Sequence, residues 1–368
     1  MNKLVFILFL FLGLYACKDV VNEIPDTPFN TTAYSFANDS LLHPVKLRSD
    51  NIPTNEGVHL GRMLFYDPIL SADSSQSCGS CHMQELAFTD NGTRFSTGIR
   101  GMEGKRNAMP IFNLMWHVEG FFWDGRAKLL RHQSLLPIQD PLEMDETLGN
   151  VLVKLNNSDL YKEHFKKAFN VDEIDEEHLS FALEQFMITI FSGDSKFDRV
   201  QKGLETFTQE EEIGRIVFNA ESIPLNEEND RNNPINYGGD CFHCHGESNL
   251  FKQRDFSNNG LDETLTDLGR GEFTGIASDN GKFKVPSLRN IEKTAPYMHD
   301  GRFNTLEEVV DFYMSGVQAN SPNIDAKMHA LQDSVYLSPA HRAALVSFLK
   351  TLTDDTYLTN EKYSNPFK

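Results

Sequence analysis

Two Cys-x-x-Cys-His pentads, at residues 78–82 and 241–245, contain four of the five cysteines of the chain. The fifth, Cys17, lies in an N-terminal leader, so no pair remains for a disulfide scaffold. This pentad is the attachment motif of c-type haem: its two thiols add to the porphyrin vinyl groups, and its His then ligates the iron. The sequence therefore predicts two covalently bound c-type haems.

A zinc site or a redox dithiol is the alternative at each pentad. On this composition a Cys is followed by Cys at +3 and His at +4 by chance at about 4 in 10,000. Zinc would need further ligands and gives no reason for an adjacent His in both pentads. We interpret His243, inside the second pentad, as a spacer residue. The predicted haem-binding residues are Cys78, Cys81, His82, Cys241, Cys244 and His245.

The ligand on the far side of each iron decides whether that iron can bind a small molecule. After His82 the next histidine is His117, and we expect the first iron to be open, with ligation by His117 as the alternative. The methionines in this gap have no obvious ligand context: Met83, Met102, Met109 and Met115. The candidates after His245 are Met298, His299, Tyr313 and Met314.

Helices must position these groups, because no stretch of the sequence alternates convincingly as a strand. Apolar residues at helical spacing predict helices over 145–156 and 175–191. A capping box at 305–308 begins another helix, with Gly316 as its stop, and the Ser-Pro pair at 338–339 begins the last one. Tyr313 and Met314 would lie about 100° apart on their helix, so only one of them could face a given iron.

The two halves of the chain echo each other. We expect a domain boundary near 192–210 and a polar insert over 221–237 in the second copy. Besides the pentads, three motifs recur in the same order: Gly-Arg with a following Phe (61–65, 214–218), Arg-Asn (106–107, 289–290) and Asp-Gly-Arg (124–126, 300–302).

The composition is that of a globular, acidic protein. The 368 residues are 40% hydrophobic and 24% charged, with a formal net charge of −19. These values argue against disorder, collagen and a multi-span membrane protein. So acidic a surface repels nucleic acid and suits a basic protein partner.

Residues 1–16 have the features of a signal peptide, with an apolar run from Leu4 to Tyr15 that is too short to span a bilayer. The run ends in Leu-Tyr-Ala-Cys, which resembles a bacterial lipobox and implies cleavage before Cys17 and lipidation of its thiol. An ordinary signal peptide that contains a Cys is the alternative. We expect an exported lipoprotein of a Gram-negative-type bacterium, periplasmic or outer-membrane-associated, held to the membrane surface through Cys17.

Over residues 55–350 the sequence resembles the bacterial di-haem cytochrome c peroxidase family, which includes the MauG proteins. The resemblance rests on both pentads and on segments 60–66, 106–108, 122–127, 141–144, 286–290 and 296–301. It implies an all-α fold of two cytochrome c-like domains, each with one covalently bound c-type haem, joined by long loops. The expected division is a signal peptide (1–16), a lipidated Cys and tether (17–53), an N-terminal domain with the peroxidatic haem (54–205), a C-terminal domain with the electron-transfer haem (206–352) and a C-terminal tail (353–368).

The resemblance also implies roles for single residues. The haem on His82 would be the peroxidatic one, and the haem on His245 would receive electrons. Glu143 and Gln133 match the family's peroxide-side pair, where a carboxylate can move a proton between the peroxide oxygens; otherwise both are ordinary polar residues. Trp123 matches the Trp between the haems, as an electron relay, a packed core residue or both.

Three places separate subgroups of this family. The loop in which many members carry a distal His has Ile99 and Arg100 here, which implies a permanently open first haem. On the second iron the peroxidases place a Met and MauG a Tyr; a count without gaps gives Tyr313, with Met314 one residue away. The Trp that precedes the second pentad of MauG is replaced by Gly239.

A calcium ion between the haems is a further implication of the resemblance. The family site uses an Asn side chain and two backbone carbonyls, and oxygen-only ligands suit Ca²⁺. The matching residues are Asn107, Thr294 and Pro296.

Three functions follow from these observations. The first is a peroxidase that reduces hydrogen peroxide to water with electrons from a small cytochrome c or a cupredoxin, whose docking the acidic charge would favour. The second is a MauG-like oxidase that modifies a partner protein through high-valent iron; Tyr313 favours it and Gly239 counts against it. The third is a non-enzymatic di-haem electron carrier or peroxide sensor, which requires both irons to be six-coordinate.

Overall fold

The computed structural model describes residues 30–36, 41, 47–90, 92–117, 120–222, 238–246, 255–328 and 337–368. The expected signal peptide, Cys17 and most of the expected tether lie outside these residues, as does most of the polar insert. Within the described ranges, no helix combines the length and the apolar character needed to cross a membrane.

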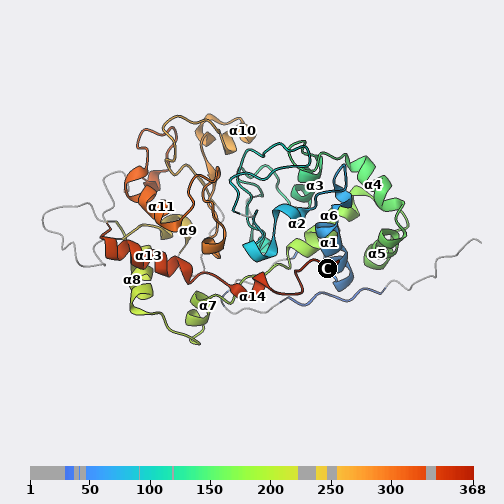
Figure 1. Cartoon of the computed structure of the whole chain (residues 1–368), viewed down its shortest axis with the longest axis horizontal. Helices are drawn as coiled ribbons and strands as arrows, with labels where there is room; N and C mark the ends of the chain where they lie inside the picture. The colour runs from blue at the N-terminus through green and yellow to red at the C-terminus, as the bar shows by residue number, and fades with distance from the viewer. Residues whose placement is uncertain are drawn as a thin grey trace, which may run out of the picture.

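The described part of the chain is mainly helical (Figure 1). The α-helices are α1 (Asn55–Tyr66), α2 (Cys78–Cys81), α3 (Leu130–Gln139), α4 (Leu148–Asn156), α5 (Asp159–Phe169), α6 (Glu176–Met187), α7 (Lys196–Gln201), α8 (Gln209–Asn219), α9 (Phe242–His245), α10 (Arg270–Thr274), α11 (Leu306–Asp311), α13 (Pro339–Lys350) and α14 (Asp355–Leu358). Short 3-10 helices are η1 (Pro68–Leu70), η2 (Gln84–Leu86), η3 (Leu114–Trp116), η5 (Ala277–Asp279), η6 (Ile291–Lys293) and η8 (Ala326–Met328), and η7 (Phe312–Gly316) is a π-helical turn. The strands β1 (Phe256–Ser257) and β2 (Phe283–Lys284) pair antiparallel.

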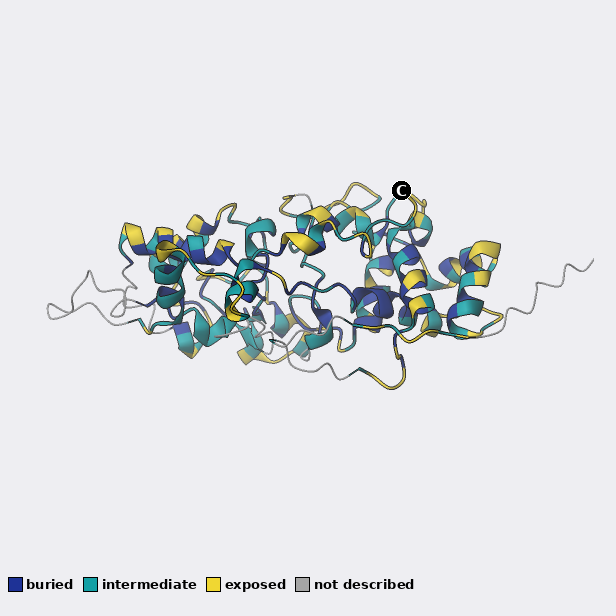
Figure 2. Cartoon of the chain, turned by 90° about the horizontal axis from the view of Figure 1, so that it is seen from below, coloured by how far each residue is buried: buried dark blue, intermediate teal, exposed yellow. Residues whose placement is uncertain are grey.

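The buried apolar side chains form two clusters, and Figure 2 shows buried segments, in dark blue, among the helices on both sides of the molecule. The first cluster draws on α1 and α3 to α6, and the second on α8, α11 and α13. Figure 1 shows these two groups of helices at opposite ends of the molecule. Two cores of this kind are what a duplicated sequence would build.

The repeated Gly-Arg motif marks the same helix crossing in both cores. α1 packs on α6, and α8 packs on α13. A Cβ added at Gly61 would lie 1.9 Å from the carbonyl oxygen of Ala182, and one at Gly214 would lie 1.9 Å from that of Ala344. Only glycine permits such a close approach, so this motif reflects helix packing.

The Asp-Gly-Arg motif also builds the same turn twice. Asp124 pairs with Arg126 at 3.0 Å, and Asp300 pairs with Arg302 at 2.9 Å. The middle glycine has a positive φ in both copies, 72° and 64°, a conformation that favours glycine. The equivalence predicted from the sequence is therefore present in the backbone.

The third repeated motif, Arg-Asn, does not occupy equivalent positions in the two halves, and this prediction is wrong. Asn290 has φ 57° and donates its backbone N–H to the carbonyl of Leu352 at 2.9 Å. The residue in the first half with this geometry is Asn113, which has φ 54° and donates to the carbonyl of Ile190 at 2.9 Å. Asn113 and not Asn107 is thus the structural counterpart of Asn290.

The helix starts follow the caps predicted from the sequence. The helix expected over 145–156 begins later, at the first residue of α4, because the side chain of Thr147 caps it. Asp175 caps α6, and the capping box of Thr305 and Glu308 is present at α11. A helix does continue to Gly316, but its last turn is the π turn η7.

The end of the chain returns to the first core. The helix that begins after Ser338, α13, was expected to be the last, but α14 follows it. Tyr357 and Tyr363 are buried in the first cluster. The hydroxyl of Tyr66 donates to the carbonyl of Tyr363 at 2.7 Å, so the expected C-terminal tail is packed against α1.

Candidate functional site

The first pentad forms α2 and the residue that ends it. Cys78 and Cys81 are the first and last residues of this helix, a spacing that places them on one face. Nδ1 of His82 lies 2.8 Å from the carbonyl oxygen of Phe88. Because a carbonyl only accepts, Nδ1 carries the proton and Nε2 is the nitrogen that can bind a metal.

The second pentad has the same arrangement. Cys241 precedes α9, and Cys244 lies within it. Nδ1 of His245 lies 3.0 Å from the carbonyl oxygen of Pro286. Both histidines are thus held in the tautomer that suits ligation of an iron, by backbone carbonyls that sequence reasoning did not identify.

A cavity lies beside the second pentad. Cys241, Cys244 and His245 line it, and Tyr313, Met314 and Met298 line it as well. Further apolar lining comes from Phe218, Val285, Leu306, Val310, Leu345 and Leu349. An apolar cavity with two thiols, an oriented imidazole and a phenol or thioether in its lining suits a c-type haem, so the residues present fit this group.

The predicted distal residues of the second iron lie on the π turn η7. Tyr313 and Met314 both line the cavity, and the structure therefore leaves the choice between them open. The side chain of Asn259 donates to the hydroxyl of Tyr313 at 3.3 Å and to the sulfur of Met298 at 3.6 Å. Burial raises the pKa of Tyr313 to about 12, although the hydrogen bond from Asn259 lowers it.

Glu143 lies close to the first pentad. Burial, and after it the charge of Asp140, raise the pKa of Glu143 to about 7, while Arg126 lowers it. Burial raises the pKa of Cys78 to about 12 and that of Cys81 to about 11, and the negative charge of Glu143 adds to both shifts. The structure therefore brings this predicted carboxyl within electrostatic range of both thiols.

Many members of the family have a distal His in a loop that corresponds to residues 98–100 here. This loop contacts the segment around Glu143. The backbone N–H of Ile99 donates to the carbonyl of Glu143 at 2.9 Å. A Cβ at Gly98 would lie 2.2 Å from the carbonyl oxygen of Leu142. Arg100 forms an ion pair with Asp145. Three contacts thus fix this loop next to the predicted acid–base residue.

Gln133 and Trp123 occupy different surroundings. Gln133 is half-buried on α3. Trp123 lines the cavity of the second half although it belongs to the first. Its indole N–H donates to the carbonyl of Asn107 at 2.9 Å, and its own carbonyl accepts from the backbone N–H of Lys284 at 2.7 Å. Trp123 therefore lies where the two halves meet.

The three residues expected to bind calcium all line the same cavity: Asn107, Thr294 and Pro296. The side-chain amide of Asn107 donates to the carbonyls of Thr93 and Arg94, each at 3.2 Å. Its side chain is therefore held in place by the chain itself, and calcium at this position stays a prediction.

His117 is the residue that could close the first iron. Its Nε2 is buried and has no hydrogen-bond partner among the described residues. Burial, and after it the positive charge of Lys284, hold its pKa well below the usual range. The ring stacks on Phe121 with centroids 5.7 Å apart. The imidazole is therefore neutral, and ligation of the first iron by His117 stays an alternative.

Comparisons with known proteins agree with these observations. The family model for the di-haem cytochrome c peroxidase matches residues 55–206. The chain is 33% identical over 318 residues to the methylamine utilization protein MauG of Methylorubrum extorquens, which covers 85% of this chain and 82% of that protein. It is 34% identical over 302 residues to the cytochrome c551 peroxidase of Nitrosomonas europaea, which covers 80% of this chain and 79% of that protein.

Among solved structures, a MauG-like protein associated with microbial copper homeostasis superposes with a TM-score of 0.79 and 31% sequence identity, over 91% of this chain and 100% of that one. The helical fold, the paired pentads with their oriented histidines and these similarities lead to one conclusion: the chain belongs to the di-haem cytochrome c peroxidase family.

Proposed function

We propose that this protein reduces hydrogen peroxide to water with electrons from a small redox protein, a cytochrome c or a cupredoxin. The observation that carries the proposal is the half-buried Glu143 carboxyl, whose pKa is raised to about 7 beside the first pentad. A group with a pKa near the working pH can both accept and return a proton, which peroxide cleavage requires.

The haem groups are held, in this proposal, by the thiols of both pentads, with His82 and His245 as iron ligands. When bound, the haems supply the iron at which the peroxide bond breaks and the route for two electrons. The carbonyls of Phe88 and Pro286 hold the imidazoles in their ligating orientation.

The remaining chemistry belongs to side chains. Glu143 takes a proton from the inner peroxide oxygen and returns it to the outer one, and Gln133 donates its amide N–H to peroxide. Asp140 and Arg126 tune the pKa of Glu143 in opposite directions. Trp123, at the contact between the halves, relays electrons.

The finer assignments are part of the same proposal. Residues 54–205 and 206–352 form two cytochrome c-like domains, supported by the two separate cores, and residues 353–368 bind back to the first. Tyr313, whose hydroxyl accepts a hydrogen bond from Asn259, would be the second protein ligand of the iron that His245 holds. Calcium binds at Asn107, Thr294 and Pro296, and Cys17 anchors the exported protein to a membrane surface.

Each of the two alternative functions is supported by one feature of the chain. A MauG-like modification of a partner protein is favoured by Tyr313. Gly239 counts against it, since this position has no aromatic side chain, and even an added Cβ would lie 3.1 Å from the sulfur of Cys241. An electron carrier or sensor without peroxidase activity would need His117 as an iron ligand, and the buried Nε2 of His117 has no hydrogen-bond partner among the described residues.

One experiment separates the three functions. Haem-loaded protein is mixed with hydrogen peroxide and a reduced cytochrome c, and peroxide loss and cytochrome oxidation are followed together. We expect two cytochromes oxidised per peroxide and high-spin features in the ferric spectrum. A wholly low-spin spectrum without turnover would support the electron carrier or sensor. Peroxide consumption that requires a partner protein and modifies it would support the MauG-like oxidase.

A further inference from the structure

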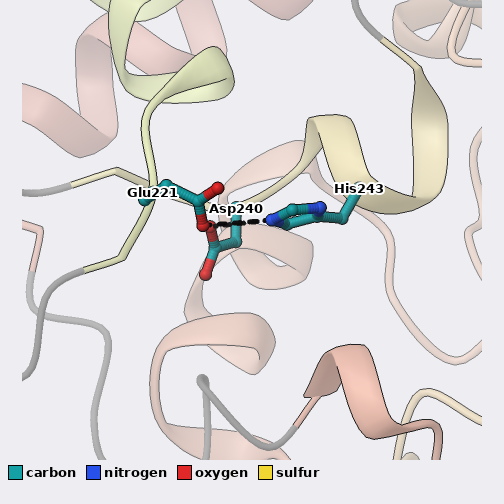
Figure 3. A group of neighbouring side chains, drawn as sticks. All are labelled: Glu221, Asp240 and His243. Carbon is teal, nitrogen blue, oxygen red and sulfur yellow. Dashed lines mark hydrogen bonds and ion pairs between the residues drawn. The ribbon is translucent and has the colours of Figure 1, made fainter.

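A second group of ligating side chains adjoins the second pentad, and two of its members, Asp240 and His243, also line the cavity beside that pentad. The group consists of Glu221, Asp240 and His243 (Figure 3). One carboxylate oxygen of each acidic residue and one ring nitrogen of the histidine all lie within 4.8 Å of one another. Nε2 of His243 lies 3.0 Å from Oε2 of Glu221 and 3.7 Å from Oδ1 of Asp240. Among the described residues this is the one such cluster of three acidic or histidine side chains.

The backbone holds the three residues together. The N–H of Gly238 donates to the carbonyl of Glu221 at 3.0 Å, and the N–H of Asp240 donates to the carbonyl of Ala220 at 3.2 Å. A Cβ at Gly238 would lie 1.7 Å from the carbonyl oxygen of Ala220, so the two segments approach as closely as glycine allows. His243 follows on α9. The cluster is therefore built before any ligand binds.

One buried oxygen in this cluster has no hydrogen-bond partner in the part of the chain that the structure describes. Asp240 is 7% exposed, and its Oδ2 accepts a hydrogen bond from the hydroxyl of Ser222. Its Oδ1 is buried and has no hydrogen-bond partner among the described residues. That oxygen faces Nε2 of His243 from beyond hydrogen-bonding distance. Leaving a buried carboxylate oxygen unpaired is costly, and a cation between these atoms would remove the cost.

The spacing suits a small divalent ion. Zinc binds His nitrogen and carboxylate oxygen at about 2.0–2.2 Å, so two ligand atoms of a tetrahedral site lie roughly 3.3 Å apart. The two separations from His243, 3.0 and 3.7 Å, lie on either side of this value. Calcium takes six to eight oxygens, and a nitrogen with two carboxylates does not suit it.

We propose that Glu221, Asp240 and His243 bind a divalent transition-metal ion of the zinc type, with the fourth position open to water or a small ligand. The side chains that would hold this ion differ from the predicted ligands of the haem irons and of calcium. His243, interpreted from the sequence as a spacer, is the nitrogen ligand of this site.

The test is equilibrium dialysis of haem-loaded, chelator-stripped protein against zinc, with excess calcium present and with zinc and iron counted in the same samples. We expect one tightly bound zinc per chain. Replacing Glu221 by Gln should weaken binding at least about 100-fold, since loss of a ligand exceeds the 10–100-fold typical of supporting residues. Glu210→Gln, an exposed carboxylate at the far end of α8, is the matched control and should bind like the wild type.

The iron count shows whether both pentads carry haem, and so distinguishes zinc bound by empty thiols from zinc bound by the three-residue cluster. Thiols that carry no haem bind zinc themselves, but such binding would not respond to Glu221→Gln. No saturable zinc binding, or wild-type affinity in Glu221→Gln, would show that the three side chains form only an ion-pair cluster. Glu221 is exposed, so this variant is expected to fold; Asp240→Asn, which alters the buried ligand, provides the second measurement.

Discussion

The pKa of Glu143 sets the pH dependence expected for peroxide turnover. Burial and the charge of Asp140 raise this pKa from 4.5 to about 7, which corresponds to about 3 kcal/mol of lost stabilisation of the carboxylate. If the carboxylate takes the proton, turnover falls tenfold per pH unit below the pKa. At pH 5 only about 1% of Glu143 would be ionised, against about three quarters for an ordinary glutamate.

Substitutions around this carboxyl test the cause of the shift. Glu143→Gln should lower turnover about 100- to 10,000-fold and abolish the acidic limb of the pH profile. Asp140→Asn should move that limb to lower pH, because it removes a negative charge, and Arg126→Gln should move it to higher pH. Glu173→Gln, an exposed carboxylate in the same half, is the control.

The assay is steady-state reduction of peroxide by reduced cytochrome c between pH 4.5 and 8.5, analysed as kcat/KM. A profile that stays flat down to pH 5 would contradict the raised pKa. Full turnover in Glu143→Gln would contradict its role as proton carrier. An unmoved limb in Asp140→Asn would show that burial alone sets the pKa.

The same shift has a consequence for stability, with the opposite sign. Between pH 4.5 and 7 folded Glu143 keeps a proton that the unfolded chain releases, so the folded state loses stability as pH rises through this window. The loss is complete above the folded pKa and amounts to at most about 3 kcal/mol. Glu143→Gln should therefore raise the free energy of unfolding at pH 8 but not at pH 4, measured by denaturant titration.

Other predictions concern the second half and the contact between the halves. Tyr313→Phe should change the ferric spectrum and raise the potential of the second haem, measured by redox titration, because a phenolate stabilises oxidised iron. Asp198→Asn should lower the free energy of unfolding by about 3–5 kcal/mol, since it removes the negative charge that pairs at 2.6 Å with the guanidinium of Arg289, and both side chains are 1% exposed. Trp123→Phe should slow electron transfer between the haems in stopped-flow reduction while both pentads keep their haem. Calcium chelation should change the same rate in the wild type, and Asn107→Ala should show the changed rate without chelator.

The features that could be predicted from sequence are those written in contiguous residues. The pentads, the caps at Thr305 and Ser338 and the repeated Gly-Arg and Asp-Gly-Arg motifs depend on local spacing, and the structure contains each of them. The predicted pairing of the two Arg-Asn motifs was wrong because it compared residue types alone. Asn113 and Asn290 are equivalent because both have a left-handed backbone and both donate a hydrogen bond to a carbonyl just beyond the end of a distant helix. Order along the chain does not carry that information.

The positions of the candidate ligands of the second iron could not be predicted from the sequence for a different reason. The expectation that only one of Tyr313 and Met314 could face the iron assumed a uniform α-helix, on which the two side chains diverge by about 100°. The chain instead leaves α11 through a π turn, and both side chains line the cavity. Such turns are rare and occur frequently at functional sites. The local geometry therefore depends on what the turn packs against, including the hydrogen bond from Asn259, 54 residues earlier in the chain.

The orientation of the two proximal histidines explains why the residues that hold them do not recur at matching positions in the two halves. His82 is held by a carbonyl six residues later, and His245 by one 41 residues later. Because any residue type supplies a carbonyl, only its place in space is constrained, and the loop between the imidazole and its acceptor can lengthen freely. The pentads themselves must keep two thiols and an imidazole in fixed register with one porphyrin. A duplicated haem-binding chain is therefore expected to diverge in its loops first, and the positions that sequence reasoning missed, Phe88 and Pro286, act through backbone atoms that leave no residue signature.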